Sequence, residues 1–221
     1  MSAPPRVVVF DVIETLFSLA PTRTVMSNAG LASASLELWF ARLLRDAFAI
    51  TAAGGYAEFE AVGRGALMTM LDGGEDQEPT IARIFDSLRA LPAHPDAAPA
   101  LERCVAADVA VVALTNGTAA TAEQLLERSG LAPLITRVLS VHDVGVWKPA
   151  ARVYRAAIGD AVTNSEAALV AVHGWDIYGA RRAGLMTGWC SRLEGVLSPA
   201  LGPADVEGDD LLAVVEGLLG S

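Results

Sequence analysis

Two carboxylates and a lysine in this sequence have the chemical types and the positions that covalent catalysis needs. Asp11 ends the apolar run Val7–Phe10, Lys148 precedes a proline, and Asp176 lies at the start of a helical pattern. A carboxylate can act as a nucleophile when a neighbouring cation keeps it ionised and oriented, and a second carboxylate can position or activate water. Asp11 is therefore the candidate nucleophile, with Lys148 and Asp176 as its partners.

Polar residues follow four strand-like segments of the chain. They are, in chain order, Asp11, Thr115–Gly117, the loop that leads to Lys148, and His173–Asp176. The carboxyl ends of parallel strands meet at one edge of a sheet, so these groups should converge on one crevice. Thr115 and Asn116 add a hydroxyl and an amide at a helix start, where small anions bind.

The elements that must position these side chains alternate between strand and helix. Val7–Phe10 is a continuous run of mostly β-branched residues, which is typical of a central parallel strand. Further strands are expected at 109–114, 138–141, 168–172 and, as an edge strand, 186–190, with helices between them and a last helix over 209–219. Pro149 should open one of these helices. The pattern predicts an α/β fold with a doubly wound, Rossmann-like parallel sheet.

Residues from about 20 to 92 have a different pattern. Apolar side chains recur there at helical spacing in segments that include Leu36, Phe59 and Ile81, and no strand-like alternation is visible. We expect about four helices, followed by a proline-rich return linker over 91–99. The sequence thus predicts an α/β core domain formed by 1–18 and 95–221, and a helical cap domain over 19–94, inserted after the first strand.

Composition excludes several classes of function. The 221 residues are 52% hydrophobic and 19% charged, which excludes intrinsic disorder, and the net charge of −10 argues against a nucleic-acid partner. The start of the chain does not resemble a signal peptide, and no apolar stretch reaches the ~18–20 residues of a membrane span. The two cysteines, Cys104 and Cys190, suggest reduced thiols in the cytoplasm. A small anionic substrate is the expected partner, and no nucleic acid or membrane.

The four groups of polar residues, with their neighbours, resemble the four motifs of the haloacid dehalogenase superfamily. The resembling stretches are Phe10–Leu16, Leu114–Gly117, Val146–Pro149 and Trp175–Ala180. They occur in the superfamily's order, and the resemblance extends over nearly the whole chain, including a helical cap after the first strand.

Ile13 points to one branch of that superfamily. Its phosphatases usually carry a second aspartate two residues after the nucleophile, which protonates the leaving alcohol, and further carboxylates in the fourth motif that bind Mg²⁺. Here Ile13 cannot donate a proton, and the fourth motif has the single acid Asp176. A halide leaves without protonation. The sequence is therefore similar to the L-2-haloacid dehalogenase (type II) branch, which implies no metal site and no cofactor.

This resemblance implies a two-step reaction and a role for each residue. Asp11 displaces the halide from the carbon next to the substrate carboxylate, and water oriented by Asp176 and Lys148 hydrolyses the resulting ester. Thr15 orients Asp11. The substrate carboxylate is bound by Thr115 and the amides that begin the next helix, and Asn116 donates to the halide.

The chain departs from that branch in its cap. An arginine usually follows the Leu-Trp pair and cradles the halide, whereas here Phe40 follows Leu38–Trp39, and Arg42 comes two residues later. Two helix positions correspond to about 200° of rotation. We take Arg42 as a candidate ligand all the same, and Trp39, Phe40 and Trp175 as candidate apolar walls of the substrate pocket.

Other departures lie in the core motifs. Thr115 replaces the usual serine, and His173 stands where asparagine is usual, so that it could orient water or act as a base. Tyr154 follows Lys148 by six residues, as in the dehalogenase branch, and is a candidate substrate contact.

The sequence leaves two alternatives open. One is a Mg²⁺-dependent phosphatase that acts on a small phosphate ester; Mg²⁺ would be a cofactor only in that case. The other is a catalytically silent relative that binds a small carboxylate. The resemblance also implies a homodimer.

Overall fold

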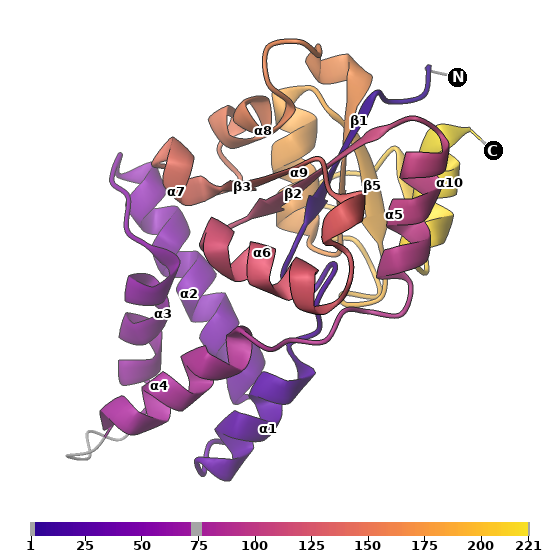
Figure 1. Ribbon diagram of the computed structural model, residues 1–221. Helices are drawn as coiled ribbons and strands as arrows, with labels where there is room; N and C mark the ends of the chain where they lie inside the picture. The colour runs from indigo at the N-terminus through magenta and orange to yellow at the C-terminus, as the bar shows by residue number, and fades with distance from the viewer. Residues whose placement is uncertain (1–2, 72–76, 221) are drawn as a thin grey trace.

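The computed structural model describes residues 3–71 and 77–220, and within them a six-stranded, wholly parallel sheet forms the centre of the molecule (Figure 1). The strand order is β3-β2-β1-β4-β5-β6. The strands are β1 (Val7–Asp11), β2 (Ala110–Thr115), β3 (Arg137–Ser140), β4 (Ala167–Ala171), β5 (Met186–Cys190) and β6 (Val206–Gly208). The predicted doubly wound α/β fold is confirmed.

Helices cover both faces of this sheet. The helices of the described residues are, in chain order, α1 (Ala20–Asn28), α2 (Ser35–Ala52), α3 (Phe59–Met68), α4 (Gln77–Leu88), α5 (Ala97–Ala106), α6 (Ala119–Arg128), the 3₁₀ turn η1 (Ala132–Leu134), α7 (Val141–Val144), α8 (Ala151–Ile158), the 3₁₀ turn η2 (Asn164–Glu166), α9 (Gly174–Ala183) and α10 (Leu211–Leu219). The helices α5, α6 and α10 pack on one face, and α8 and α9 on the other.

Strand β1 lies in the middle of the sheet because its side chains are apolar on both faces. Val8 and Phe10 join the core on one face, and Val7 and Val9 join the core on the other. This arrangement follows from the alternation of side chains along a strand. It leaves Asp11, the last residue of β1, at the carboxyl edge of the sheet between β2 and the end of β4.

Two expectations about the elements are wrong. β5 is not an edge strand, because Val206–Gly208 pairs beside it as β6; three residues are too few to carry a recognisable alternation. Pro149 does not open α8, which begins at Ala151. The Ala150 N–H donates instead to the carbonyl of Trp147 at 3.0 Å, so Pro149 lies within a turn that precedes the helix.

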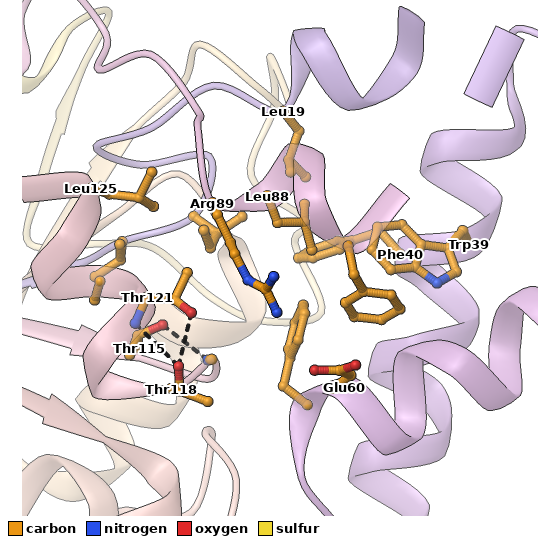
Figure 2. A pocket seen from close by; sticks show the side chains of 16 residues that line it. Leu19, Trp39, Phe40, Glu60, Leu88, Arg89, Thr115, Thr118, Thr121 and Leu125 are labelled. Carbon is orange, nitrogen blue, oxygen red and sulfur yellow. Dashed lines mark hydrogen bonds between the residues drawn. The ribbon is translucent and has the colours of Figure 1, made fainter. Parts of the chain in front are cut away.

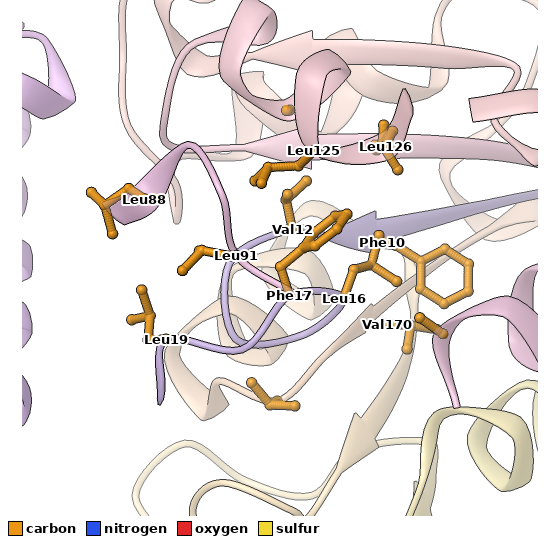
Figure 3. Packing of buried hydrophobic residues seen from close by; sticks show 14 of the residues in the cluster. Phe10, Val12, Leu16, Phe17, Leu19, Leu88, Leu91, Leu125, Leu126 and Val170 are labelled. Atoms are coloured by element: carbon orange, nitrogen blue, oxygen red, sulfur yellow. The ribbon is translucent and has the colours of Figure 1, made fainter. Parts of the chain in front are cut away.

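The segment between β1 and α5 forms four helices in the part of the chain that is described. α2 packs against α3 and α1 against α4 (Figure 1). Their core is continuous with the core on one face of the sheet. Figure 3 shows this junction, where Leu88 of α4 and Leu125 of α6 belong to the same cluster of buried side chains as Leu16 and Phe17. The helical insertion (α1 to α4) therefore shares its core with the sheet.

Candidate active site

Asp11, Lys148 and Asp176 form one buried charge cluster at the carboxyl edge of the sheet. The Lys148 Nζ atom lies 2.7 Å from Asp11 Oδ1 and 2.7 Å from Asp176 Oδ2, and 3.4 Å from the carbonyl of Leu114. Lys148 is fully buried. Burial opposes its charge, but the two carboxylates together raise the pKa of Lys148 above its usual value. The lysine is thus an ammonium ion that binds both acids.

Thr15 fixes the second oxygen of Asp11. Its hydroxyl donates to Asp11 Oδ2 at 2.7 Å and accepts from the Val172 N–H at 3.2 Å. The loop after β1 and the end of β4 therefore hold the same hydroxyl. With Lys148 on one oxygen and Thr15 on the other, the carboxylate of Asp11 has a defined orientation.

Tyr154 positions Asp176. The Tyr154 hydroxyl donates to Asp176 Oδ1 at 2.5 Å, and both side chains are fully buried. Burial raises the pKa of Tyr154 well above its usual value, so the hydroxyl stays a donor. Burial also raises the pKa of Asp176, against the opposing effect of Lys148. Tyr154 was predicted as a substrate contact; the structure places it behind Asp176, outside the lining of the cavities described below.

Gly179 leaves the space that the Tyr154 hydroxyl occupies. A Cβ atom at Gly179 would lie 2.5 Å from Tyr154 Oη and 2.9 Å from the carbonyl of Pro149. We expect Gly179→Ala to lower the free energy of unfolding by about 1–3 kcal/mol, as overpacking does. Gly65→Ala in α3 is the matched control, because nothing lies within 4 Å of its Cβ; it should raise stability by roughly 0.5–1 kcal/mol. Urea denaturation measures both, and equal effects would contradict the packing argument.

His173 lies in a stack of three rings above Asp11. Its ring centroid is 5.7 Å from that of Phe40 and 5.3 Å from that of Trp175, with interplanar angles of 25° and 22°. Its Nε2 atom is 4.0 Å from Asp11 Oδ2. Burial lowers the pKa of His173, and Lys148 adds to this while Asp11 opposes it. A neutral imidazole is able to accept a proton next to the nucleophile.

Glu14 was not singled out from the sequence. Its Oε2 atom lies 3.5 Å from His173 Nε2. Its backbone has a φ of 67°, in the left-handed region that residues other than glycine rarely adopt. Burial, and then the charge of Asp11, raise the pKa of Glu14 to about 7. Its position between Asp11 and Thr15 was the signal available in the sequence.

Two adjoining cavities open beside the charge cluster. The smaller, about 10 Å³, is lined by Asp11 together with other candidate residues, namely Thr115, Asn116, His173, Trp175 and Phe40. The larger, about 60 Å³, lies between α4 and α6 and is lined by Trp39, Phe59 and Arg89 among others (Figure 2). Ile13, Phe40, Phe59, Thr115 and Gly117 line both.

Arg42 lies apart from these cavities. Its guanidinium donates to the carbonyl and to the hydroxyl of Thr69 on the exposed side of the helical insertion, at 3.3 and 3.1 Å. Phe40, two residues earlier on α2, faces the site instead, as the rotation along a helix requires. Trp39 is fully buried, and its indole N–H donates to the carbonyl of Gly63 at 2.9 Å.

Neither a metal cluster nor a membrane span is found among the described residues. In 3–71 and 77–220 no three or more His, Cys, Asp or Glu side chains are grouped so that they could hold a metal ion. Over the same residues no helix has the length and apolar character needed to cross a bilayer.

Comparisons with known proteins agree with this geometry. The family of haloacid dehalogenase-like hydrolases matches residues 5–184. (S)-2-haloacid dehalogenase 4A of Burkholderia cepacia is 32% identical over 82% of this chain and 81% of that protein. A phosphoserine phosphatase of Thermus thermophilus is 30% identical over 81% of this chain and 72% of its own length. The crystal structure of a dehalogenase with an intermediate complex has a TM-score of 0.87 at 28% identity, over 100% of both chains.

Proposed function

Because the chain belongs to the haloacid dehalogenase-like hydrolases, we propose that it hydrolyses the carbon–halogen bond of a small 2-haloacid through an ester on Asp11. One observation carries this proposal: a buried ammonium, Lys148, binds and orients the carboxylate of Asp11 at a cavity that five apolar side chains also line. The similarity to (S)-2-haloacid dehalogenases supports the same reaction.

The first step forms the ester. The carboxylate of Asp11 attacks the carbon that bears the halogen; a carbon–oxygen bond forms, the carbon–halogen bond breaks, and the halide leaves with the bonding electron pair. No proton is needed by the leaving group, which suits Ile13 as a wall of the cavity. Thr115 and the amides at the start of α6 bind the substrate carboxylate, and Asn116 donates to the halide.

The second step releases the product. Water attacks the carbonyl carbon of the Asp11 ester, Lys148 stabilises the negative charge that develops on the oxygen, and Asp176 orients the water. His173, held next to Asp11 by its two aromatic neighbours, is placed to accept the proton of the water. The ester C–O bond then breaks, and the departing alkoxide takes the proton back from His173 to become the hydroxyl of the 2-hydroxyacid. Asp11 is regenerated as a carboxylate, and the second proton of the water passes to solvent. No cofactor takes part in either step.

Halide release tests this proposal. We expect the protein to release halide from chloroacetate, fluoroacetate or an enantiomer of 2-chloropropionate in excess EDTA. Asp11→Asn should abolish release, whereas Asp160→Asn, an exposed aspartate after α8, should leave it unchanged. In a single turnover in ¹⁸O-water, mass spectrometry should find the label in the peptide that contains Asp11, because water attacks the ester of that side chain.

Other outcomes identify the alternatives. Magnesium-dependent release of phosphate from small esters, with no halide release, would indicate a phosphatase, the activity named in the Thermus relative. Binding of small carboxylates without turnover would indicate a silent relative. Either result would refute the dehalogenase proposal.

We also propose a cap, a homodimer and a cytoplasmic location. The return of the chain from the helical insertion near residue 94 supports a cap over 19–94. The exposed apolar side chains Leu38 and Met68 on α2 and α3 support a dimer through these helices. Cys104 and Cys190 are both buried and free, which supports a reducing compartment.

A further inference from the structure

We propose that the larger cavity binds the side chain of the substrate and that Arg89, which lines this cavity and not the smaller one, binds a second carboxylate. The preferred substrates are then 2-halo dicarboxylic acids with an apolar spacer. This inference rests on the proposed dehalogenase function, because it names the substrate class of the same site.

The two cavities divide the substrate into a reacting end and a remote end. Asp11 lines the smaller cavity and not the larger, whereas Arg89 lines the larger and not the smaller. The residues that line both, Ile13 and Thr115 among them, show that the two spaces adjoin. A carbon attacked by Asp11 therefore lies at the smaller cavity, and a longer acyl chain extends toward the larger.

The walls of the larger cavity suit an apolar chain. Aromatic and aliphatic side chains from the helical insertion face aliphatic side chains of the sheet domain; these are Leu19, Trp39, Phe40, Phe59, Phe85 and Leu88 on one side, and Val12, Ala122 and Leu125 on the other. Such walls bind the methylene groups of a substrate. A polar group at the end of its chain finds partners only where charged or hydroxyl side chains line the cavity.

The larger cavity has groups that can bind an anion. In Figure 2 the Arg89 guanidinium lies between Thr121 of α6 and Glu60 of α3, and all three residues line the larger cavity. The Thr118 hydroxyl donates to Thr121 Oγ1 at 2.9 Å, so the Thr121 hydroxyl keeps its own hydrogen for an acceptor in the cavity. A guanidinium and a hydroxyl that can both donate hydrogen bonds favour a carboxylate.

The charges around Arg89 leave it able to bind. Its ion pair with Asp86, at 2.8 Å, joins two side chains that are more than half exposed, and such surface pairs are weak. The acid in the lining, Glu60, is itself paired with Arg64 at 3.0 Å. Among the described residues that line this cavity, Arg89 alone carries a positive charge.

Direct binding tests the inference without any reaction. By calorimetry, we expect glutarate or adipate to bind at least about tenfold more tightly than the monocarboxylate of equal chain length, pentanoate or hexanoate. Arg89→Gln should remove this preference. Arg83→Gln, which changes an exposed arginine of α4 outside the cavity lining, should keep it. Dicarboxylates that bind no better than monocarboxylates would overturn the inference whatever the halide assay shows.

Turnover provides the second arm. The wild type should have a higher kcat/KM for 2-chloroadipate than for 2-chlorohexanoate. Arg89→Gln should remove this difference by raising the KM for 2-chloroadipate, whereas turnover of 2-chloropropionate, which has no second carboxylate, should stay within twofold. Equal losses on all three substrates would overturn the subsite and make Arg89 a structural residue. Preferential binding of adipate without halide release from any substrate would instead refute the proposed reaction while the carboxylate subsite stood.

Discussion

Lys148→Met abolishes measurable halide release and destabilises the protein, because both carboxylates of the charge cluster lose their common partner. Lys148 is fully buried between Asp11 and Asp176. We expect the rate to fall by about 10³-fold or more, as when a group that stabilises developing charge is removed. The free energy of unfolding should fall by about 3–5 kcal/mol, the usual cost of leaving one side of a buried ion pair unpaired. Halide release and urea denaturation measure the two effects.

A double variant separates this explanation from simple loss of packing. Lys148→Met combined with Asp11→Asn removes one of the two uncompensated charges, so it should be more stable than Lys148→Met alone. The coupling expected between contacting residues is about 0.5–3 kcal/mol. If the double variant is as unstable as the sum of the single variants predicts, the charge explanation fails.

Glu14→Gln stabilises the protein increasingly as the pH rises. The pKa of Glu14 is raised from 4.5 to about 7 in the folded protein, first by burial and then by Asp11, Glu37 and Glu194, while Arg23 opposes them. Between these values the folded state binds more protons than the unfolded state. The stability contributed by Glu14 is therefore present at low pH and is lost as the pH rises through about 7.

Glutamine is neutral at every pH and does not incur this loss. At about 1.4 kcal/mol per pKa unit, we expect the stability advantage of Glu14→Gln over the wild type to grow by about 2–3 kcal/mol between pH 5 and pH 8. Urea denaturation at both pH values measures it. Glu37→Gln, a nearby exposed acid whose pKa is lowered by Arg23, should show no such growth. An advantage of Glu14→Gln that is equal at pH 5 and pH 8 would contradict the raised pKa.

The sheet and its charge cluster could be predicted because their signals are local. The apolar run that ends at Asp11 identifies a central strand, and polar residues after parallel strands must meet at one edge. That rule places Asp11, Lys148 and Asp176 together without knowledge of any side-chain conformation. The strand β6 escaped prediction because three residues carry too short a pattern.

The walls of the site were harder to predict because helix register decides them. Arg42 and Phe40 are two residues apart on α2, and only the packing of that helix determines that Phe40 meets His173. Tyr154 was selected by its spacing from Lys148, but its contact with Asp176 depends on how α8 lies against α9. Arg89 belongs to no motif, and its place in the cavity follows from where α4 ends beside α6.

Lys148 is also the only lysine in the chain; the other fifteen residues of the sixteen lysines and arginines are arginines. The protein thus has a single side-chain amine, and it lies inside the charge cluster with no exposed surface. A reagent that acylates amines finds no side-chain target on the closed protein and one target when the site opens. The mass increase at Lys148 therefore records how often the site opens to solvent, and a ligand that keeps the site closed slows that increase.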